Sequence, residues 1–146
     1  MIQIARSTSK SGIWKQGSAE SIPMANESLD AVVAIFTIHH WKKLKKGFEE
    51  VARVLKPGGR FLILTGWPKQ MDGYWLKHYF PKMINDSKAF MPKEARVIRL
   101  LKTAGFHDIK QENYTVQPDL KDHFLYAGKH HPEKYLDPEI RIGISS

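Results

Sequence analysis

The chain of 146 residues contains no cysteine. Disulfide bonds, thiolate metal sites and cysteine nucleophiles are therefore excluded, although this absence alone leaves the compartment open. The sequence also lacks a long apolar run, since its longest, residues 31–38, is far below the roughly 20 residues that a membrane-spanning helix requires. The first residues lack the long apolar centre of a secretory signal. These absences predict a cytoplasmic protein with no membrane partner.

The formal net charge of +8 raises the question of a nucleic-acid partner. The densest basic patch is the segment WKKLKKG, residues 41–47, in which four lysines surround one leucine. Charge runs of this kind are usually solvated faces. Because no recognition-helix, zinc-finger or RNA-sheet motif accompanies the patch, the sequence argues against nucleic acid, and an RNA-modifying enzyme stays as the weaker alternative.

A continuous apolar run, AVVAIFTI, covers residues 31–38. Its β-branched and aromatic composition is typical of a strand buried on both faces of a parallel sheet. The next segment, residues 44–55, predicts an amphipathic helix because apolar residues recur every three or four positions. We expect Glu49 and Arg53 on its outer side, at the spacing of an ion pair. The apolar positions of this helix are Leu44, Phe48, Val51 and Leu55.

The segment Pro57-Gly58-Gly59 is expected to end this helix, because proline cannot continue it and glycine accepts a left-handed exit. The following RFLILTGW, residues 60–67, predicts a second buried strand. Strand, helix and strand with short links form a βαβ unit with parallel strands. A shorter strand is predicted upstream, over residues 12–20.

Beyond residue 67 the sequence becomes rich in aromatic residues and methionine. A further helix is predicted over residues 92–106, starting at Pro92 and ending at Gly105. Two strand-like segments follow, residues 107–117 and 122–130, and predict an antiparallel hairpin at a sheet edge.

The order of these elements resembles the second half of a class I S-adenosylmethionine-dependent methyltransferase, of the small-molecule type that includes quinone-biosynthesis enzymes. The most specific part is GSAESIPMANESLDAVVAIFTIHHWKKLKKGFEEVARVLKPGGRFLIL, residues 17–64. It follows the family order of an acidic strand-end turn, an apolar strand with a His-rich end, a helix ending in Arg-Val-Leu-Lys-Pro-Gly-Gly, and another strand. The later phrases TAGF and YLDPEIRIGISS also resemble the family.

The resemblance implies an α/β fold: a partial Rossmann-like methyltransferase sheet with a parallel βαβ core and an antiparallel edge hairpin. The family's first two strands, with the Gly-x-Gly-x-Gly cofactor loop, have no counterpart in the sequence. We therefore expect residues 1–146 to form a single, incomplete (truncated) methyltransferase domain, with an acceptor-side insertion at residues 68–91. A homodimer in which a second copy completes the sheet would cover the edges left open.

The resemblance also implies S-adenosyl-L-methionine as cofactor. The turn after the first predicted strand would lie against the adenine ring, with the Ala19 amide facing a ring nitrogen. The usual acidic residue of this turn is Ser18, which keeps an acceptor oxygen but no charge. The alternative is an ordinary strand-end turn. The implied cofactor-binding residues are Ser18, Ala19, Glu20, Phe36, Thr37 and Ile38.

The histidines at the end of the second predicted strand are candidates for acid–base chemistry, because imidazole titrates near neutral pH. His40 is the preferred general base for a hydroxyl or acidic carbon of the acceptor; the alternative is that a histidine packs or caps the following helix. Adjacent histidines point apart on a strand, so no metal is expected. Further acceptor-side candidates, for which a core role is the alternative, are His39, Trp41, Trp67, Trp75, His78 and Tyr79.

The function implied is S-adenosylmethionine-dependent methyl transfer to a small-molecule acceptor. This chemistry depends on alignment and on the exclusion of water, which is consistent with the lack of a catalytic triad in the sequence. The alternative is a truncated, non-catalytic relative that acts as a binding or dimerisation module.

Overall fold

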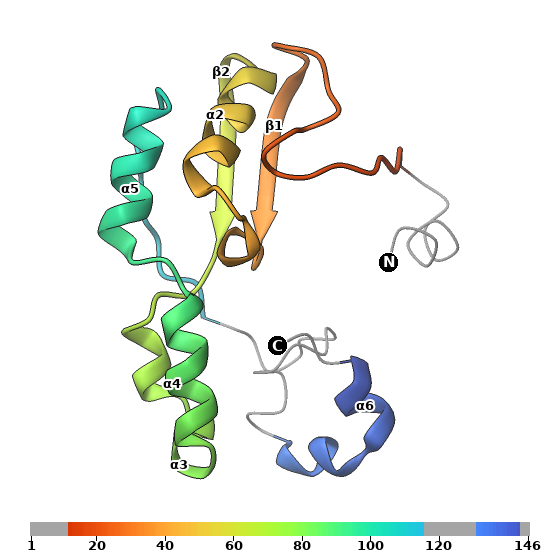
Figure 1. Cartoon of the computed structure of the whole chain (residues 1–146), viewed down its shortest axis with the longest axis vertical. Coiled ribbons are helices and arrows are strands. Elements are labelled where there is room, and N and C mark those ends of the chain that lie inside the picture. The colour runs from red at the N-terminus through yellow and green to blue at the C-terminus, as the bar shows by residue number, and fades with distance from the viewer. Residues whose placement is uncertain (1–11, 116–130, 144–146) are drawn as a thin grey trace. The chain divides into compact units, whose positions relative to one another are not determined.

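The computed structural model describes residues 12–115 and 131–143 (Figure 1). The chain divides into two compact units, Met1–Ile109 and Lys110–Ser146. In the second unit, the 3-10 helix η4 (Pro132–Leu136) contacts the helix α6 (Pro138–Gly143). The first unit contains β1 (Leu29–Ile35), η1 (Ile38–His40), α2 (Leu44–Val54), β2 (Leu55–Leu64), η2 (Gln70–Gly73), α3 (Leu76–Tyr79), α4 (Pro81–Phe90) and α5 (Glu94–Thr103).

The centre of the first unit is a parallel pair of strands joined through a helix. Strand β1 pairs with β2 from Ala31 opposite Arg60 to Ile35 opposite Leu64. Helix α2 connects them and lies over one face of the pair, with α5 beside it (Figure 1). The predicted parallel strand–helix–strand core is confirmed, and with it the α/β class.

The Pro-Gly-Gly segment has a different role from the one predicted. Helix α2 ends at Val54 and β2 begins directly at Leu55, so the helix has already ended before Pro57. The pairing register slips there, because Leu29 faces Leu55 whereas Ala31 faces Arg60. Gly58 has a φ of +76°, a left-handed conformation that favours glycine. The segment therefore forms a bulge inside β2 rather than the end of the helix.

The core lies on one side of the sheet, between the strands and helices α2 and α5. The opposite face is open in the described part of the chain: Val33, Ile35 and Leu62 are 56%, 58% and 59% exposed. The prediction of a strand buried on both faces is thus wrong for these residues, because no described helix covers the second face. The buried core residues are Ala34, Ile38, Leu44, Phe48, Val97 and Leu101.

The helix predicted over residues 92–106 is confirmed as α5, but it begins at Glu94 with Lys93 as its N-cap, so the predicted start at Pro92 is wrong. Its end is well defined. Gly105 has a φ of +98° and its N–H donates to the Lys102 carbonyl at 3.1 Å. The Phe106 N–H donates to the Leu101 carbonyl at 3.1 Å. These two bonds form a Schellman motif, which satisfies the last carbonyls of a helix.

Two predicted β elements differ in the structure. Residues 12–20 form no strand, and only an isolated antiparallel bridge joins Ser18 to Ser21. A strand needs a neighbour that accepts and donates its backbone hydrogen bonds, and no described segment offers one here. In the expected edge hairpin, residues 107–115 form no strand, and residues 116–130 lie outside the described residues.

In the described ranges, no helix has both the length and the apolar character needed to cross a membrane.

We predict that Gly47→Ala destabilises the chain. An added Cβ would lie 2.4 Å from Cε3 of Trp41, so the indole would have to leave its contact with Phe48. Such overpacking costs about 1–3 kcal/mol, more than the roughly 1 kcal/mol that alanine gains over glycine in a helix. Urea unfolding followed by tryptophan fluorescence measures the difference. Gly73→Ala is the control, since its Cβ meets nothing within 4 Å; equal effects of the two variants would contradict the packing argument.

Candidate functional site

The carboxyl ends of β1 and β2 lie at one edge of the sheet, because the strands are parallel. The Phe36 N–H donates to the Leu64 carbonyl at 2.8 Å and extends the pairing by one residue. Phe36 then adopts a φ of 44°, a conformation that non-glycine residues rarely adopt and that is concentrated at functional sites. The chain changes direction at this point and enters η1, where the His40 N–H donates to the Thr37 carbonyl at 2.9 Å.

The turn of residues 18–21 is attached to the beginning of α2. The Ser21 N–H closes it by donating to the Ser18 carbonyl at 3.1 Å. An oxygen of Glu20 accepts a 3.0 Å hydrogen bond from the Lys43 N–H, and this bond is the main reason that the pKa of Glu20 is lowered. The ionised Glu20 therefore links the turn to the segment that leaves η1. Ser18 is exposed and Ala19 is half-buried.

The two histidines form a close pair. Their ring centroids lie 3.9 Å apart, with 50° between the planes. The expectation that they point apart is wrong, because they stand on η1 and not on a strand. His40 is exposed and His39 half-buried. Burial, and secondarily the charge of His40, lower the pKa of His39, and its Nδ1 is buried without a hydrogen-bond partner among the described residues.

Three of the candidate side chains are engaged in the interior. Ile38 is 1% exposed and belongs to the core, so only its backbone could border a ligand. The Trp41 ring packs edge-on against Phe48 at 5.5 Å between centroids. The Trp67 side chain packs against the same core, and the backbone N–H of Trp67 donates to the side-chain oxygen of Gln70 at 2.7 Å.

The remaining aromatic candidates form a group of their own around α3. The ring centroids of Trp75 and Tyr79 are 6.1 Å apart, and those of His78 and Tyr79 are 5.1 Å apart. His78 and Tyr79 are exposed, and Trp75 is half-buried. The structure therefore brings together three of the acceptor-side candidates at α3.

A carboxylate shared by two lysines connects the helices of this region. An oxygen of Asp72 lies 2.6 Å from the Lys77 ammonium and 2.7 Å from that of Lys88. The hydrogen bonds from these two lysines lower the pKa of Asp72 to about 2. The shared carboxylate ties η2, α3 and α4 together.

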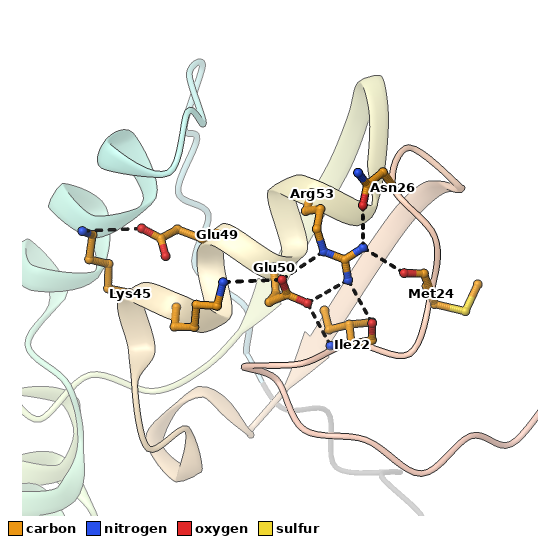
Figure 2. A network of polar contacts seen from close by, with 8 residues as sticks. Ile22, Met24, Asn26, Lys45, Glu49, Glu50 and Arg53 are labelled. Carbon is orange, nitrogen blue, oxygen red and sulfur yellow. Dashed lines mark hydrogen bonds and ion pairs between the residues drawn. The ribbon is translucent and has the colours of Figure 1, made fainter.

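Sequence reasoning missed a polar network on α2 (Figure 2). Arg53 pairs with Glu50 at 2.7 Å and not with Glu49, which lies 3.5 Å from Lys45. The hydrogen bond from Arg53 is the main reason that the pKa of Glu50 falls to about 2. The available signal was the three-residue spacing of Glu50 and Arg53 beside a polar connector, residues 21–28, whose carbonyls need donors.

Among residues 12–115 and 131–143, no group of three or more histidine, cysteine, aspartate or glutamate side chains could hold a metal ion.

Comparison with known proteins gives a consistent result. A family model described as a methyltransferase domain matches residues 1–63. The chain is 30% identical over 119 residues to the ubiquinone/menaquinone biosynthesis C-methyltransferase UbiE of Bartonella tribocorum, covering 68% of this chain and 46% of that protein. It is 33% identical over 96 residues to the chloroplastic 2-methyl-6-phytyl-1,4-hydroquinone methyltransferase of Arabidopsis thaliana, covering 65% of this chain and 26% of that protein.

A solved structure from Anabaena variabilis, described as a methyltransferase from an antibiotic biosynthesis pathway, superposes with a TM-score of 0.80 at 33% identity. The match covers 90% of this chain and 52% of that chain. The chain thus spans about half the length of the Bartonella relative and of this structure.

We predict that His39 titrates below the ordinary histidine pKa of 6.5. Burial disfavours the charged ring, and the nearby His40 adds repulsion when it is protonated. Since the folded-state pKa is below the unfolded one, His39 lowers the stability only as the pH falls below about 6.5. A carbon-13 NMR titration of the ring signals measures this pKa. In His40→Gln the pKa of His39 should rise but stay below 6.5, because burial remains; a normal value in the unaltered chain would contradict the prediction.

Proposed function

The chain belongs to the class I S-adenosylmethionine-dependent methyltransferases, and we propose that it takes part in methyl transfer to a small-molecule acceptor. The observation that supports this proposal is the sheet edge where residues 36–40 leave β1. There the strained Phe36 turns the chain, and Glu20 attaches the turn of residues 18–21 to the adjacent start of α2. In open α/β sheets, ligands bind at the carboxyl ends of the strands.

The residues at this edge fit the cofactor in chemical type. We assign the exposed Ser18 hydroxyl and the Ala19 amide to the adenine, and the backbone of residues 36–38 to the methionine part. Glu20, whose carboxylate already accepts from Lys43, is assigned to holding this turn. The buried Nδ1 of His39 offers a polar atom that a bound group could satisfy. S-adenosylmethionine, when bound, supplies a methyl group already activated on a cationic sulfur.

The acceptor is proposed to bind on the side of the histidines. His40, whose ring is exposed, would accept the proton that a hydroxyl or acidic carbon of the acceptor releases. His39, half-buried and neutral at pH 7 because burial lowers its pKa, would border the acceptor without adding charge. The aromatic group of Trp75, His78 and Tyr79 would supply ring faces that attract cations. Since relatives carry names of quinone and hydroquinone methyltransferases, we propose a hydroquinone-like ring as the acceptor class.

We predict that the chain binds S-adenosylmethionine with micromolar affinity and that His40→Gln leaves this affinity within about threefold. In His40→Gln, the rate of methyl transfer to a panel of substituted hydroquinones should fall about a hundredfold or more, because a general base contributes a factor of roughly 10²–10⁴ to the rate. Calorimetry measures the binding, and transfer of a labelled methyl group measures the reaction. His107→Gln is the control, since this ring is 88% exposed and stands outside the proposed site. Full transfer by His40→Gln, with loss in His39→Gln instead, would move the base to His39; no binding by the unaltered chain contradicts the proposal.

A second candidate function is favoured by the open face of the sheet. The side chains of Val33, Ile35 and Leu62 are more than half exposed there, whereas parallel sheets are normally covered on both faces. We propose that a second copy of the chain covers the face, as a dimerisation module would.

Leu62→Lys is predicted to shift the chain from dimer to monomer, because it places a charge in the centre of the apolar face. Sedimentation equilibrium measures the mass of both proteins in solution. Phe90→Lys is the control, since it removes a 77% exposed apolar side chain on α4 and not on the sheet. A monomeric unaltered chain, or a dimer that Leu62→Lys leaves intact, would refute the second candidate.

A further inference from the structure

All five N–H groups of the Arg53 guanidinium donate hydrogen bonds (Figure 2). The acceptors belong to Glu50 and to the connector before β1. The Nε and Nη2 atoms donate to the two oxygens of Glu50 at 2.9 and 2.7 Å. The remaining bonds go to the connector before β1: Nη2 to the Ile22 carbonyl at 2.9 Å, and Nη1 to the Met24 carbonyl at 2.9 Å and the Asn26 side-chain oxygen at 2.8 Å. A planar guanidinium can satisfy five acceptors in fixed directions, which an ammonium cannot.

Ile22 is held on both sides of its backbone. Its carbonyl accepts from Arg53, and its N–H donates to Oε2 of Glu50 at 3.0 Å. Glu50 is 7% exposed and is the buried charged residue of the described chain. A buried charge-assisted network of this kind, with every donor of the arginine satisfied, holds the backbone in one position.

These two hydrogen bonds of the Ile22 backbone lie next to the turn of residues 18–21. Ile22 follows Ser21, whose N–H closes the turn, and on the other side Glu20 is bonded to the Lys43 N–H. Both attachments come from α2 or from the residue that caps its start. The turn is therefore attached to the helix and its N-cap at two points that are two residues apart, one through Glu20 and one through Ile22.

We propose that Glu50 and Arg53 are positioning residues for the adenine of the cofactor: they set the place and orientation of the turn whose Ser18 and Ala19 face the base. The inference rests on the proposed function, in which this turn borders the adenine. Since neither side chain is assigned to the ligand itself, their effect on binding is exerted through the backbone of Ile22. Loss of these hydrogen bonds should weaken cofactor binding. Above all, it should reduce the preference for adenine over a base whose hydrogen-bonding groups differ.

The test uses Arg53→Lys, which keeps the positive charge and removes the planar guanidinium with its five directed N–H donors. The probes are S-adenosylhomocysteine and its inosine counterpart, in which a carbonyl replaces the adenine amino group. For the unaltered chain we expect about tenfold or greater preference for the adenine compound in calorimetry; in Arg53→Lys the preference should fall to about threefold or less. Amide hydrogen exchange at residues 18–22 should become faster while α2 keeps its protection.

Two further variants keep the inference falsifiable. Asn26→Ala removes one of the five bonds and should lower the preference less, in a protein whose fold is less perturbed. Glu50→Gln and Glu49→Gln are a matched pair on neighbouring positions of α2: the first should reduce the preference, whereas the second, which only breaks the exposed pair with Lys45, should not.

The possible outcomes distinguish a failure of this inference from a failure of the proposed function. Faster exchange at residues 18–22 with an unchanged base preference in Arg53→Lys would show a purely structural network and overturn the inference, while the proposed function stands. If the unaltered chain binds neither compound, the proposed function fails, and the inference fails with it. A general loss of stability in Arg53→Lys would weaken the binding of both compounds equally and leave the ratio of their affinities unchanged, which also counts against the inference.

Discussion

Two parallel strands cannot be joined by a tight turn and need a crossover, and in this protein the crossover helix α2 is the element on which the first unit depends. Its apolar side places Phe48 in the core against the sheet. Its polar side binds the preceding connector through Glu50 and Arg53, and its N-cap residue, Lys43, donates a backbone N–H to the Glu20 carboxylate. One helix therefore fixes both the sheet edge and the turn that the proposed site combines.

The sequence was sufficient for the elements whose signal is local. The spacing of apolar residues predicted α2, and Gly105 marked the end of α5. It was insufficient where a partner decides the outcome. Pro-Gly-Gly is compatible with a helix end or with a bulge, and the pairing of Leu29 with Leu55 selects the bulge. Residues 12–20 have a strand-like composition, but a strand forms only beside another strand.

The same limit applies to the candidate site. The position of residues 36–40 at a sheet edge followed from the order of strand and helix. The direction of each side chain did not: Ile38 turns into the core, and the two histidines pair because η1 replaces the last part of the strand. Arg53 had two glutamates within reach, and the bonds to the connector carbonyls, which lie on the Glu50 side, decide between them.

The open face of the sheet and the proposed cofactor edge are physically linked, because the same strand forms both. Burying an apolar side chain such as Ile35 contributes about 1.5–3 kcal/mol, so whatever covers this face stabilises β1 up to its last residue. Phe36, whose N–H pairs with Leu64, continues directly from that residue in a strained conformation that persists only if the surroundings hold it. If the proposed partner binds the face, it would therefore favour the backbone geometry at the edge, and a ligand bound at the edge would favour covering of the face by the same free energy.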